Sequence, residues 1–223
     1  MNNFDYLIKY IIVGDVSVGK SNILLKYVYN KFNDFYSPTI GAEFGFKKVQ
    51  IDGKIFNVQI WDTAGQEAFH SIIRSYYKCS ACAIIVYDVT NRSSFESIKT
   101  WIEDCRTLCH SKTNIFLVAN KIDLHSQRVV TKEEGQNLAE ENDIKFYEVS
   151  AKTGKNLQKM FDEILRDIKT KIEEGYFNLK DETCGVKVGN LVNISNKTKT
   201  VGNMQLSAER IKRDNDKNGC GGC

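Results

Sequence analysis

The sequence predicts an α/β domain with a mostly parallel sheet of six strands, one antiparallel edge strand and about five flanking helices. Strand-like segments alternate with helix-like segments of 10–19 residues, which is typical of parallel strands joined by crossover helices. Residues 82–88 and 114–120 are nearly continuous apolar runs, as expected of strands covered on both faces. An Asp-Gly dipeptide at residues 52–53 lies between two alternating segments and indicates a hairpin.

Residues 1–61 contain three predicted strands and one predicted helix. Residues 6–13 form a strand rich in β-branched and aromatic side chains, which ends before Gly14. Residues 20–30 repeat their apolar side chains at helical spacing. Residues 43–51 and 54–61 alternate apolar and polar side chains, and they are the two strands of the predicted hairpin.

From residue 82 onward, strands and helices alternate regularly. The predicted elements are strand 82–88, helix 94–109, strand 114–120, helix 131–142, strand 144–149 and helix 156–174. Thr131 is followed three residues later by Glu134, which predicts a capping box at the start of its helix. This order completes the α/β pattern.

Composition and charge exclude several classes of protein. Apolar residues make up 42% and charged residues 26% of the chain, near the globular average, which excludes wholesale disorder and a fibrous protein. The longest apolar run, residues 81–87, is far shorter than the about 20 residues of a membrane-spanning helix. Residues 1–168 contain 21 basic and 21 acidic side chains, and residues 169–223 contain 10 and 7. The small excess leaves no basic stripe for nucleic acid.

The sequence predicts one domain over residues 1–175 and a flexible, hypervariable tail over residues 176–223, because the periodic pattern fades after Gly175. The beginning of the chain lacks the basic start of a secretory signal. The seven cysteines are therefore expected to be reduced thiols of a cytosolic protein. Cys79 and Cys82 have the spacing of half a metal site, and Cys105 and Cys109 share a helix side, but packing is the favoured interpretation of both pairs.

Residues 14–21 carry the pattern of a phosphate-binding loop, Gly-x4-Gly-Lys-Ser, between a strand and a helix. Glycines let the backbone curl, so that successive N–H groups and the helix N-terminus point at phosphate oxygens. Lys20 is expected to reach the β- and γ-phosphates, and the Ser21 hydroxyl is expected to bind Mg²⁺. On this motif alone, an ATP-using enzyme or a glycine-rich turn without a ligand remains an alternative.

Three further segments end predicted strands. Asp62 is placed to hold Mg²⁺, usually through water, the Gly65 N–H can meet a γ-phosphate, and Gln66 can orient an attacking water. Residues 120–123 (Asn-Lys-Ile-Asp) and 150–152 (Ser-Ala-Lys) end two later strands. Open α/β sheets bind ligands at the carboxyl ends of their strands, so all four segments are expected to share one pocket.

Together the four segments resemble those of the small GTPase superfamily, which has the P-loop NTPase fold. The resemblance implies that Asp123 accepts two hydrogen bonds from guanine and that Asn120 and Lys121 support its loop. It also implies that the Ala151 N–H meets the guanine O6. A site that hydrogen-bonds one particular base edge rejects another base by orders of magnitude, so GTP and GDP are the expected nucleotides rather than ATP.

The resemblance also covers the segment after the first helix. Phe32 would lie against the base, Tyr36 would close over the phosphates, and Thr39 would give Mg²⁺ its second protein hydroxyl. The expected metal ligands are Ser21, Thr39 and Asp62, and the expected catalytic residues are Gln66 and Lys20. The full set of expected GTP-binding residues is Gly14, Asp15, Val16, Ser17, Val18, Gly19, Lys20, Ser21, Asn22, Phe32, Tyr36, Thr39, Gly65, Asn120, Lys121, Asp123, Ser150, Ala151 and Lys152.

Within that superfamily the chain resembles the Rab family, most closely the Rab-two subtype and next the Rab-fourteen subtype. The matching segments are residues 40–44, 58–61, 74–77 and 86–90. The resemblance implies an effector-binding aromatic triad of Phe44, Trp61 and Tyr76, although aromatic residues beside a sheet are also common core residues. Two thiols near the end, Cys220 and Cys223, imply lipidation by two geranylgeranyl groups, since stable anchoring takes two signals.

The resemblance implies a Mg²⁺-dependent GTP hydrolase that acts as a switch in vesicle traffic. Its implied partners are effectors, an exchange factor, a GTPase-activating protein, a Rab escort protein and a GDP-dissociation inhibitor. The expected location is the cytoplasmic face of endomembranes, at the Golgi or the ER–Golgi intermediate, with a cytosolic pool. A monomer is expected, with no nucleic acid bound.

Val16 departs from the family pattern, which has a small side chain at this position of the loop. A branched side chain beside the γ-phosphate is expected to slow hydrolysis. The alternative function is therefore a GTP-dependent effector-binding scaffold with very slow hydrolysis. A plasma-membrane signalling GTPase of the Ras kind is a second alternative, and an ATP-using phosphoryl transferase is a third.

Overall fold

The computed structural model describes residues 4–34, 39, 41–65 and 75–189. Its strands are β1 (Tyr6–Val13), β2 (Ala42–Ile51), β3 (Lys54–Thr63), β4 (Cys82–Asp88), β5 (Asn114–Asn120), β6 (Lys145–Glu148) and β7 (Val186–Val188). Its α-helices are α1 (Lys20–Tyr29), α3 (Arg92–Glu96), α4 (Ile98–Leu108), α5 (Lys132–Glu141) and α6 (Leu157–Glu173). Two short 3₁₀ helices, η2 (His125–Gln127) and η3 (Glu182–Cys184), complete the described part.

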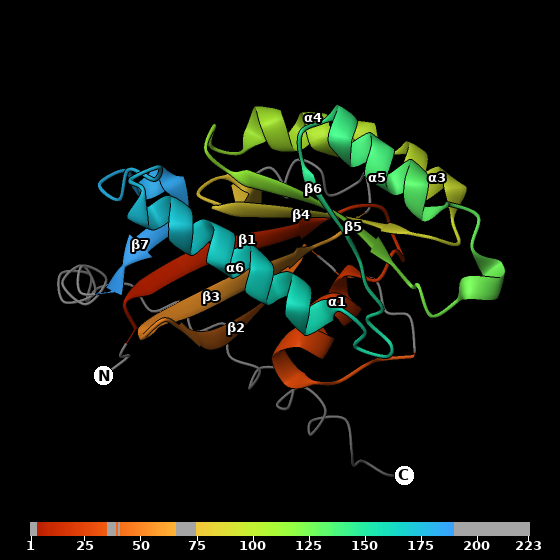
Figure 1. The fold of residues 1–223 in the computed structure, drawn as a ribbon, viewed down its shortest axis with the longest axis horizontal. Coiled ribbons are helices and arrows are strands. Elements are labelled where there is room, and N and C mark those ends of the chain that lie inside the picture. The colour runs from red at the N-terminus through yellow and green to blue at the C-terminus, as the bar shows by residue number, and fades with distance from the viewer. Residues whose placement is uncertain (1–3, 35–38, 40, 66–74, 190–223) are drawn as a thin grey trace, which may run out of the picture. The chain divides into compact units, whose positions relative to one another are not determined.

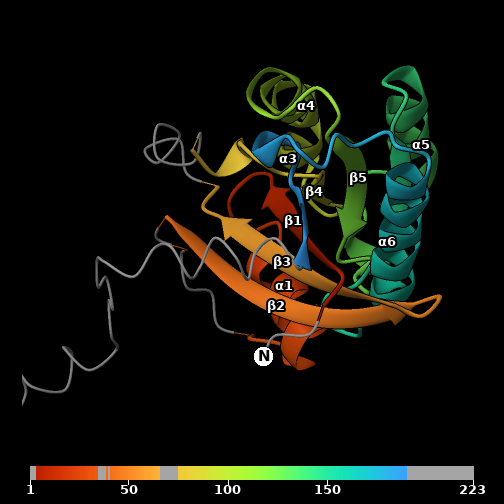
Figure 2. The same ribbon diagram turned by 90° about the vertical axis from the view of Figure 1, so that its left-hand side faces the viewer.

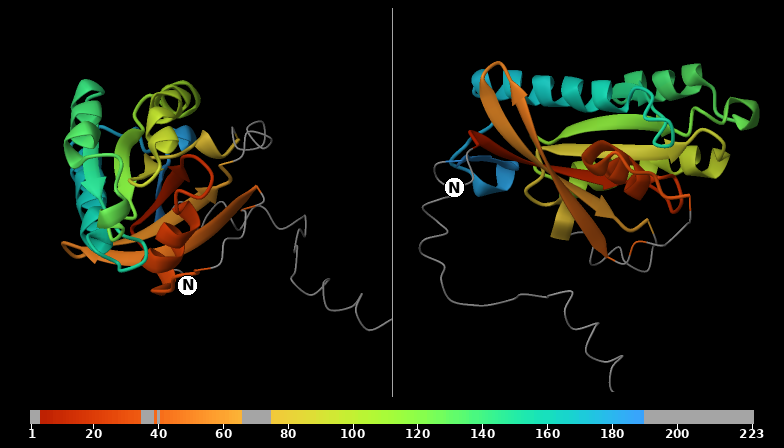
Figure 3. Two further views of the ribbon diagram at one scale, coloured as in Figure 1. Left: turned by 90° about the vertical axis from the view of Figure 1, so that its right-hand side faces the viewer. Right: turned by 90° about the horizontal axis from the view of Figure 1, so that it is seen from below.

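The sheet has the strand order β2-β3-β1-β4-β5-β6 (Figure 1). All neighbouring pairs along this path are parallel except β2 and β3, which form an antiparallel hairpin. The hairpin is the long orange pair of strands at one edge of the sheet (Figures 2 and 3). The predicted α/β fold, with a mostly parallel sheet and one antiparallel edge strand, is confirmed. The sheet was predicted with six strands, and a seventh, β7, joins it beside β1.

Two apolar cores lie against the two faces of the sheet, and β1 contributes to both. Ile8, Tyr10 and Ile12 join the core that includes side chains of α1 and α6. Ile11 and Val13 join the core that includes side chains of α4 and α5. Because successive strand residues point to opposite faces, this alternation places buried apolar side chains on both sides of β1. The strand is thereby fixed directly before the loop at residues 14–19.

The sequence did not predict β7, which pairs antiparallel with the first half of β1. The pairing of β4 with β1 begins only at Tyr10, so the backbone of residues 6–8 has an open side that β7 covers. Gly185 precedes β7 with a left-handed φ of 79°, and a Cβ there would lie 2.1 Å from the Ala81 nitrogen. The close approach therefore requires glycine.

The folded domain therefore extends beyond residue 175, where the sequence analysis predicted that it ends. The core that contains side chains of α6 and β1 also contains three buried residues of this segment, Phe177, Cys184 and Val186. The predicted boundary is fourteen residues before Gly189, the last described residue. The segment escapes sequence analysis because three strand residues and a single 3₁₀ turn are too short to show a period.

The predicted helix at residues 94–109 is divided into α3 and α4, with Ser97 as the residue between them. Asn91 caps α3 by accepting a hydrogen bond from the Ser94 N–H. The predicted capping box of α5 is confirmed, because Thr131 and Glu134 each accept a hydrogen bond from the other's backbone N–H.

Phe177→Ala tests whether residues 176–189 belong to the folded domain. We expect the free energy of unfolding to fall by about 3–5 kcal/mol, because the side chain is buried and its loss leaves a cavity. Phe46→Ala, at an exposed phenylalanine of β2, is the control and should cost less than about 1 kcal/mol. Equal denaturation midpoints for the two variants would contradict the assignment.

Candidate functional site

The loop between β1 and α1 is curled by residues in left-handed conformations. Gly14 and Gly19 have φ of 136° and 98°, and Ser17 has φ of 63°. A Cβ at Gly14 would lie 2.2 Å from the Val86 carbonyl oxygen, and a Cβ at Gly19 would lie 2.4 Å from Asn120 Nδ2. The loop is therefore pressed against the ends of β4 and β5, and only glycine fits at either position.

Lys20, the first residue of α1, is buried and folds back over this loop. Its Nζ donates hydrogen bonds of 2.7 Å to the carbonyl oxygens of Gly14 and Asp15. Burial lowers the pKa of the Lys20 ammonium to about 8, although Asp62 and Asp15 oppose this shift. Gly19, the N-cap of α1, has no side chain that could accept hydrogen bonds from the first N–H groups of the helix. These N–H groups can therefore donate to a bound anion.

Three oxygens from distant segments converge next to Lys20. The Ser21 Oγ donates a hydrogen bond of 2.6 Å to Asp62 Oδ2 and lies 3.0 Å from the Thr39 Oγ1. The Thr39 Oγ1 is 3.3 Å from the same carboxylate oxygen. These are the three residues that the sequence predicts as Mg²⁺ ligands, and α1, β3 and the segment before β2 bring them together.

This oxygen cluster fits a divalent cation. Asp62 is fully buried, and its Oδ1 has no hydrogen-bond partner among the described residues. Burial raises the pKa of the Asp62 carboxyl to about 6, whereas Ser21, Lys20 and Thr39 favour the charged form. A hard cation prefers such carboxylate and hydroxyl oxygens, and a bound Mg²⁺ would neutralise charge on phosphate oxygens there.

A second cluster gathers at the ends of β5 and β6. Asn120 Nδ2 donates to the Val18 carbonyl oxygen at 2.9 Å, and Asn120 Oδ1 accepts from the Ala151 N–H at 3.1 Å. Asp123 Oδ1 accepts a hydrogen bond of 2.6 Å from the Ser150 hydroxyl. Asn120 thus ties the phosphate loop to residues 150–152, and Ser150 orients the carboxylate that the sequence predicts to read guanine.

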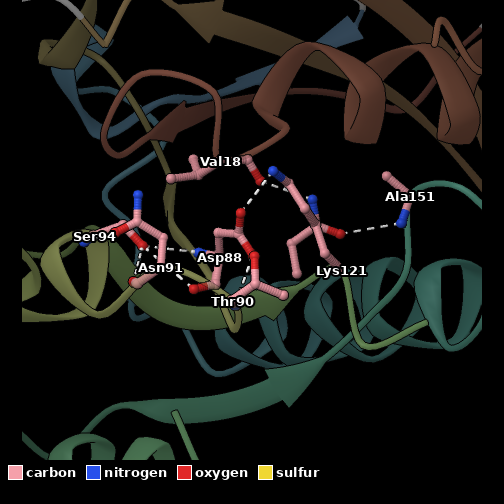
Figure 4. Close-up of polar contacts among 8 residues, drawn as sticks. Val18, Asp88, Thr90, Asn91, Ser94, Lys121 and Ala151 are labelled. Carbon is pink, nitrogen blue, oxygen red and sulfur yellow. Dashed lines mark hydrogen bonds and ion pairs between the residues drawn. The ribbon is translucent and has the colours of Figure 1, made fainter. Parts of the chain in front are cut away.

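Lys121 is held by a residue that the sequence analysis missed. Its Nζ forms an ion pair of 2.6 Å with Asp88 Oδ2, while Asp88 Oδ1 accepts hydrogen bonds from the Thr90 N–H and hydroxyl. Figure 4 shows this network together with Val18 and Ala151, the two hydrogen-bond partners of Asn120. Asp88 is the last residue of β4, and its place at a strand end is the signal that could have identified it.

Phe32 and Lys152, two of the predicted GTP-binding residues, lie close together. The Lys152 Nζ is 5.9 Å from the centroid of the Phe32 ring and 3.6 Å from Asp34 Oδ1. The sequence did not predict Asp34 as a residue of this site. The residues after α1 and the residues after β6 therefore approach each other, and Phe32, Asp34 and Lys152 all line the same cavity.

One cavity of about 610 Å³ joins the two clusters. Fourteen predicted GTP-binding residues line it: Val16, Ser17, Gly19, Lys20, Ser21, Asn22, Phe32, Thr39, Gly65, Asn120, Lys121, Asp123, Ala151 and Lys152. Four predicted residues do not line the cavity: Gly14, Asp15, Val18 and Ser150. They instead form hydrogen bonds with the lining residues Lys20, Asn120 and Asp123. Glu43 and Thr63 line the cavity and were missed. The predicted residues Tyr36 and Gln66 lie outside the described residues.

A sequence model of the Ras family matches residues 9–170, which is most of the chain and includes every segment of the cavity. The chain belongs to the Ras family. This membership confirms the predicted class, a small GTPase with a P-loop fold. Ras-family proteins bind guanine nucleotide, typically with Mg²⁺, and generally hydrolyse GTP.

The predicted aromatic triad also comes together in this Ras-family protein. The ring centroids of Phe44 and Trp61 are 5.1 Å apart, and those of Trp61 and Tyr76 are 5.2 Å apart. Phe44 is 52% exposed, and Phe46 extends the cluster with an edge-on contact to Phe44. The cluster, which comprises Phe44, Phe46, Trp61 and Tyr76, is therefore not core packing alone.

Two other interpretations concern metals and membranes. Within the described ranges, no group of three or more His, Cys, Asp or Glu side chains is arranged to hold a metal ion, so Cys79, Cys82, Cys105 and Cys109 form no such site there. The five described cysteines are free thiols. No helix among the described residues has the length and apolar character to cross a membrane.

Asp62→Asn tests the buried carboxyl of this Ras-family site. A carboxyl with a folded-state pKa of about 6 and an unfolded value near 3.8 stabilises the fold when protonated, and this stabilisation is lost as the pH rises through 6. In EDTA, the unfolding free energy of the wild type, measured relative to Asp62→Asn, should fall by about 2 kcal/mol between pH 4 and pH 7. A flat difference would contradict the assigned environment.

Proposed function

We propose that this protein is a Rab-type GTP switch that regulates vesicle traffic at endomembranes. The support is the Rab-like sequence of residues 40–44, 58–61, 74–77 and 86–90, together with the exposed aromatic cluster. That cluster is the observation that carries the proposal, because it presents apolar surface next to the nucleotide cavity. The Rab-two subtype is the favoured assignment, and the Rab-fourteen subtype is the next.

The connection from the nucleotide to the aromatic cluster runs along β2 and β3. Thr39 comes just before β2 and Gly65 just after β3, and the Ala64 N–H donates a hydrogen bond of 2.9 Å to the Gly41 carbonyl oxygen. Phe44 is paired with Trp61 in the register of the same hairpin. A change at Thr39 or Gly65 on loss of the γ-phosphate would therefore shift the strands that carry the cluster, and effectors would leave.

In the proposed reaction, Lys20 and the amides of residues 14–19 stabilise negative charge on the β- and γ-phosphates. Gln66 positions a water molecule for in-line attack on the γ-phosphate. Intrinsic turnover is expected to be slow, because residues 14–21 contain no arginine and an arginine supplied in trans is worth about 10³–10⁵ in rate. A GTPase-activating protein and an exchange factor would set the timing.

Membrane attachment is proposed to come from geranylgeranyl groups on Cys220 and Cys223, which lie outside the described residues. A Rab escort protein would present the chain for lipidation, and a GDP-dissociation inhibitor would maintain a cytosolic pool. The proposed location is the cytoplasmic face of the Golgi or the ER–Golgi intermediate. The protein is proposed to act as a monomer.

A GTP-dependent scaffold with very slow hydrolysis is the second candidate, and Val16 favours it. The Val16 side chain lines the cavity and is 38% exposed, so a branched apolar group occupies the entrance to the phosphate loop. Water and an activating arginine would have to approach through the same space. Crowding there lengthens the GTP-bound state without weakening effector binding.

Replacing both terminal cysteines tests the membrane proposal. We expect the tagged full-length chain to carry two geranylgeranyl groups by mass spectrometry and to accumulate on Golgi or ER–Golgi membranes. Cys220→Ser/Cys223→Ser should be entirely cytosolic, because both anchors are lost. Cys79→Ser, at a half-buried cysteine of the folded domain, is the control and should behave like the wild type. A single farnesyl group with plasma-membrane location would instead favour a Ras-type signalling GTPase.

Val16→Gly tests whether hydrolysis is restrained by the loop. Single-turnover GTP hydrolysis should become about tenfold faster or more in the presence of an activating protein, because removing the side chain opens the approach to the γ-phosphate. The matched control is Val129→Gly, at an exposed valine outside the cavity. Equal rates for wild type and Val16→Gly would reject the restraint.

A further inference from the structure

Asp15 places an acidic side chain in a phosphate-binding loop, and its carboxylate is held by helix α4. Asp15 Oδ1 accepts a hydrogen bond of 2.7 Å from the indole N–H of Trp101. Asp15 Oδ2 accepts a hydrogen bond of 2.8 Å from the Ser97 hydroxyl. Asp15 is not among the residues that line the nucleotide cavity. Both oxygens are thus engaged by donors, which reduces the repulsion that a free carboxylate would exert on phosphates.

The two donors are positioned by the division between α3 and α4. Ser97 is the residue between the helices, and Trp101 follows one helical turn later on the same side of α4. Trp101 is 6% exposed and belongs to the apolar core on that face of the sheet. A buried indole N–H needs a hydrogen-bond acceptor, and Asp15 is that acceptor. Because the core holds the indole ring in place, it also fixes the position of the Asp15 carboxylate.

The peptide of Asp15 is held from two other directions as well. Its carbonyl oxygen accepts the hydrogen bond from Lys20 Nζ. Gly65 lies directly against it, since a Cβ on Gly65 would come within 2.6 Å of the Asp15 carbonyl carbon and 2.7 Å of Lys20 Nζ. Asp15 therefore connects the residue expected to meet the γ-phosphate, the phosphate-binding lysine and a helix outside the cavity.

We propose that Asp15, Ser97 and Trp101 form a clamp that holds the phosphate loop in its nucleotide-binding shape and couples the occupancy of the site to α4. The inference deepens the proposed function and rests on it. Asp15 is a positioning residue here, because it acts through the loop backbone and Lys20. Ordering the loop in advance lowers the conformational cost of binding phosphates, so the clamp slows nucleotide release.

The first test measures release of a fluorescent mant-GDP from the full-length chain in excess Mg²⁺. Asp15→Ala and Trp101→Phe should each release mant-GDP about tenfold faster than the wild type, the effect of losing a hydrogen bond to a charged group. The double variant should be no more than about twofold faster than the faster single variant, because both changes break the same contact. Asp15→Asn keeps an oxygen that can accept from the indole N–H, so its mant-GDP release rate should be close to that of the wild type.

Ser97→Ala keeps the test valid where Asp15→Ala fails to fold. It removes one hydroxyl and should speed release about threefold, whereas Ser93→Ala, an exposed serine one turn earlier, should release mant-GDP at the wild-type rate. Release rates within twofold of the wild type for folded Asp15→Ala, Ser97→Ala and Trp101→Phe would overturn the clamp, even if the melting temperatures of these variants fall. A wild type that binds no mant-GDP would overturn the proposed switch itself, which is a separate outcome.

The second test uses fluorescence of Trp101. The chain contains two tryptophans, so Trp61→Phe leaves Trp101 as the sole reporter. Stripping nucleotide and Mg²⁺ with EDTA should shift the Trp101 emission in Trp61→Phe, because the clamp loosens when the loop is empty. The shift should be absent from Trp61→Phe/Asp15→Ala. An emission that is insensitive to nucleotide in Trp61→Phe would overturn the coupling to α4.

Discussion

The tight curl of the phosphate loop against the sheet is the constraint on which the rest of the structure depends. At Gly14 and Gly19, a single additional carbon would come within 2.2–2.4 Å of atoms of β4 and β5. This contact lets Lys20 reach back to the loop carbonyl oxygens and lets Asn120 bond to Val18. The phosphate side and the base side of the cavity are therefore fixed to each other by the same few peptides.

Buried charge is the second feature of the site. Lys20 and Asp62 are both almost fully buried, and burial shifts their pKa values in opposite directions, each toward its neutral form. Such an arrangement is unfavourable for the empty protein and becomes favourable when phosphate and a cation supply the missing charges. These buried charges thus lower the stability of the fold and increase the affinity for phosphate and a cation, as is common at functional sites.

The described chain ends at the opposite end of β1 from the phosphate loop. The Gly189 N–H donates a hydrogen bond of 2.8 Å to the Asp5 carbonyl oxygen, and β7 covers the edge of β1 that β4 leaves open. Gly189, the last described residue, therefore lies at the end of β1 that is away from the nucleotide cavity.

The sequence by itself determined the first six strands, the phosphate loop, the predicted metal ligands and the segments predicted to bind the base, because glycine conformation, hydrophobic period and short motifs are local properties. Tertiary structure alone decided which distant side chains meet. Trp101 and Ser97 reach Asp15, and β7 returns to β1, although nothing in their local sequence signals a partner. Asp88 holds Lys121, and its place at the end of β4 does not say which residue it will meet. These contacts depend on how helices and strand ends pack in space, and no period along the chain records that arrangement.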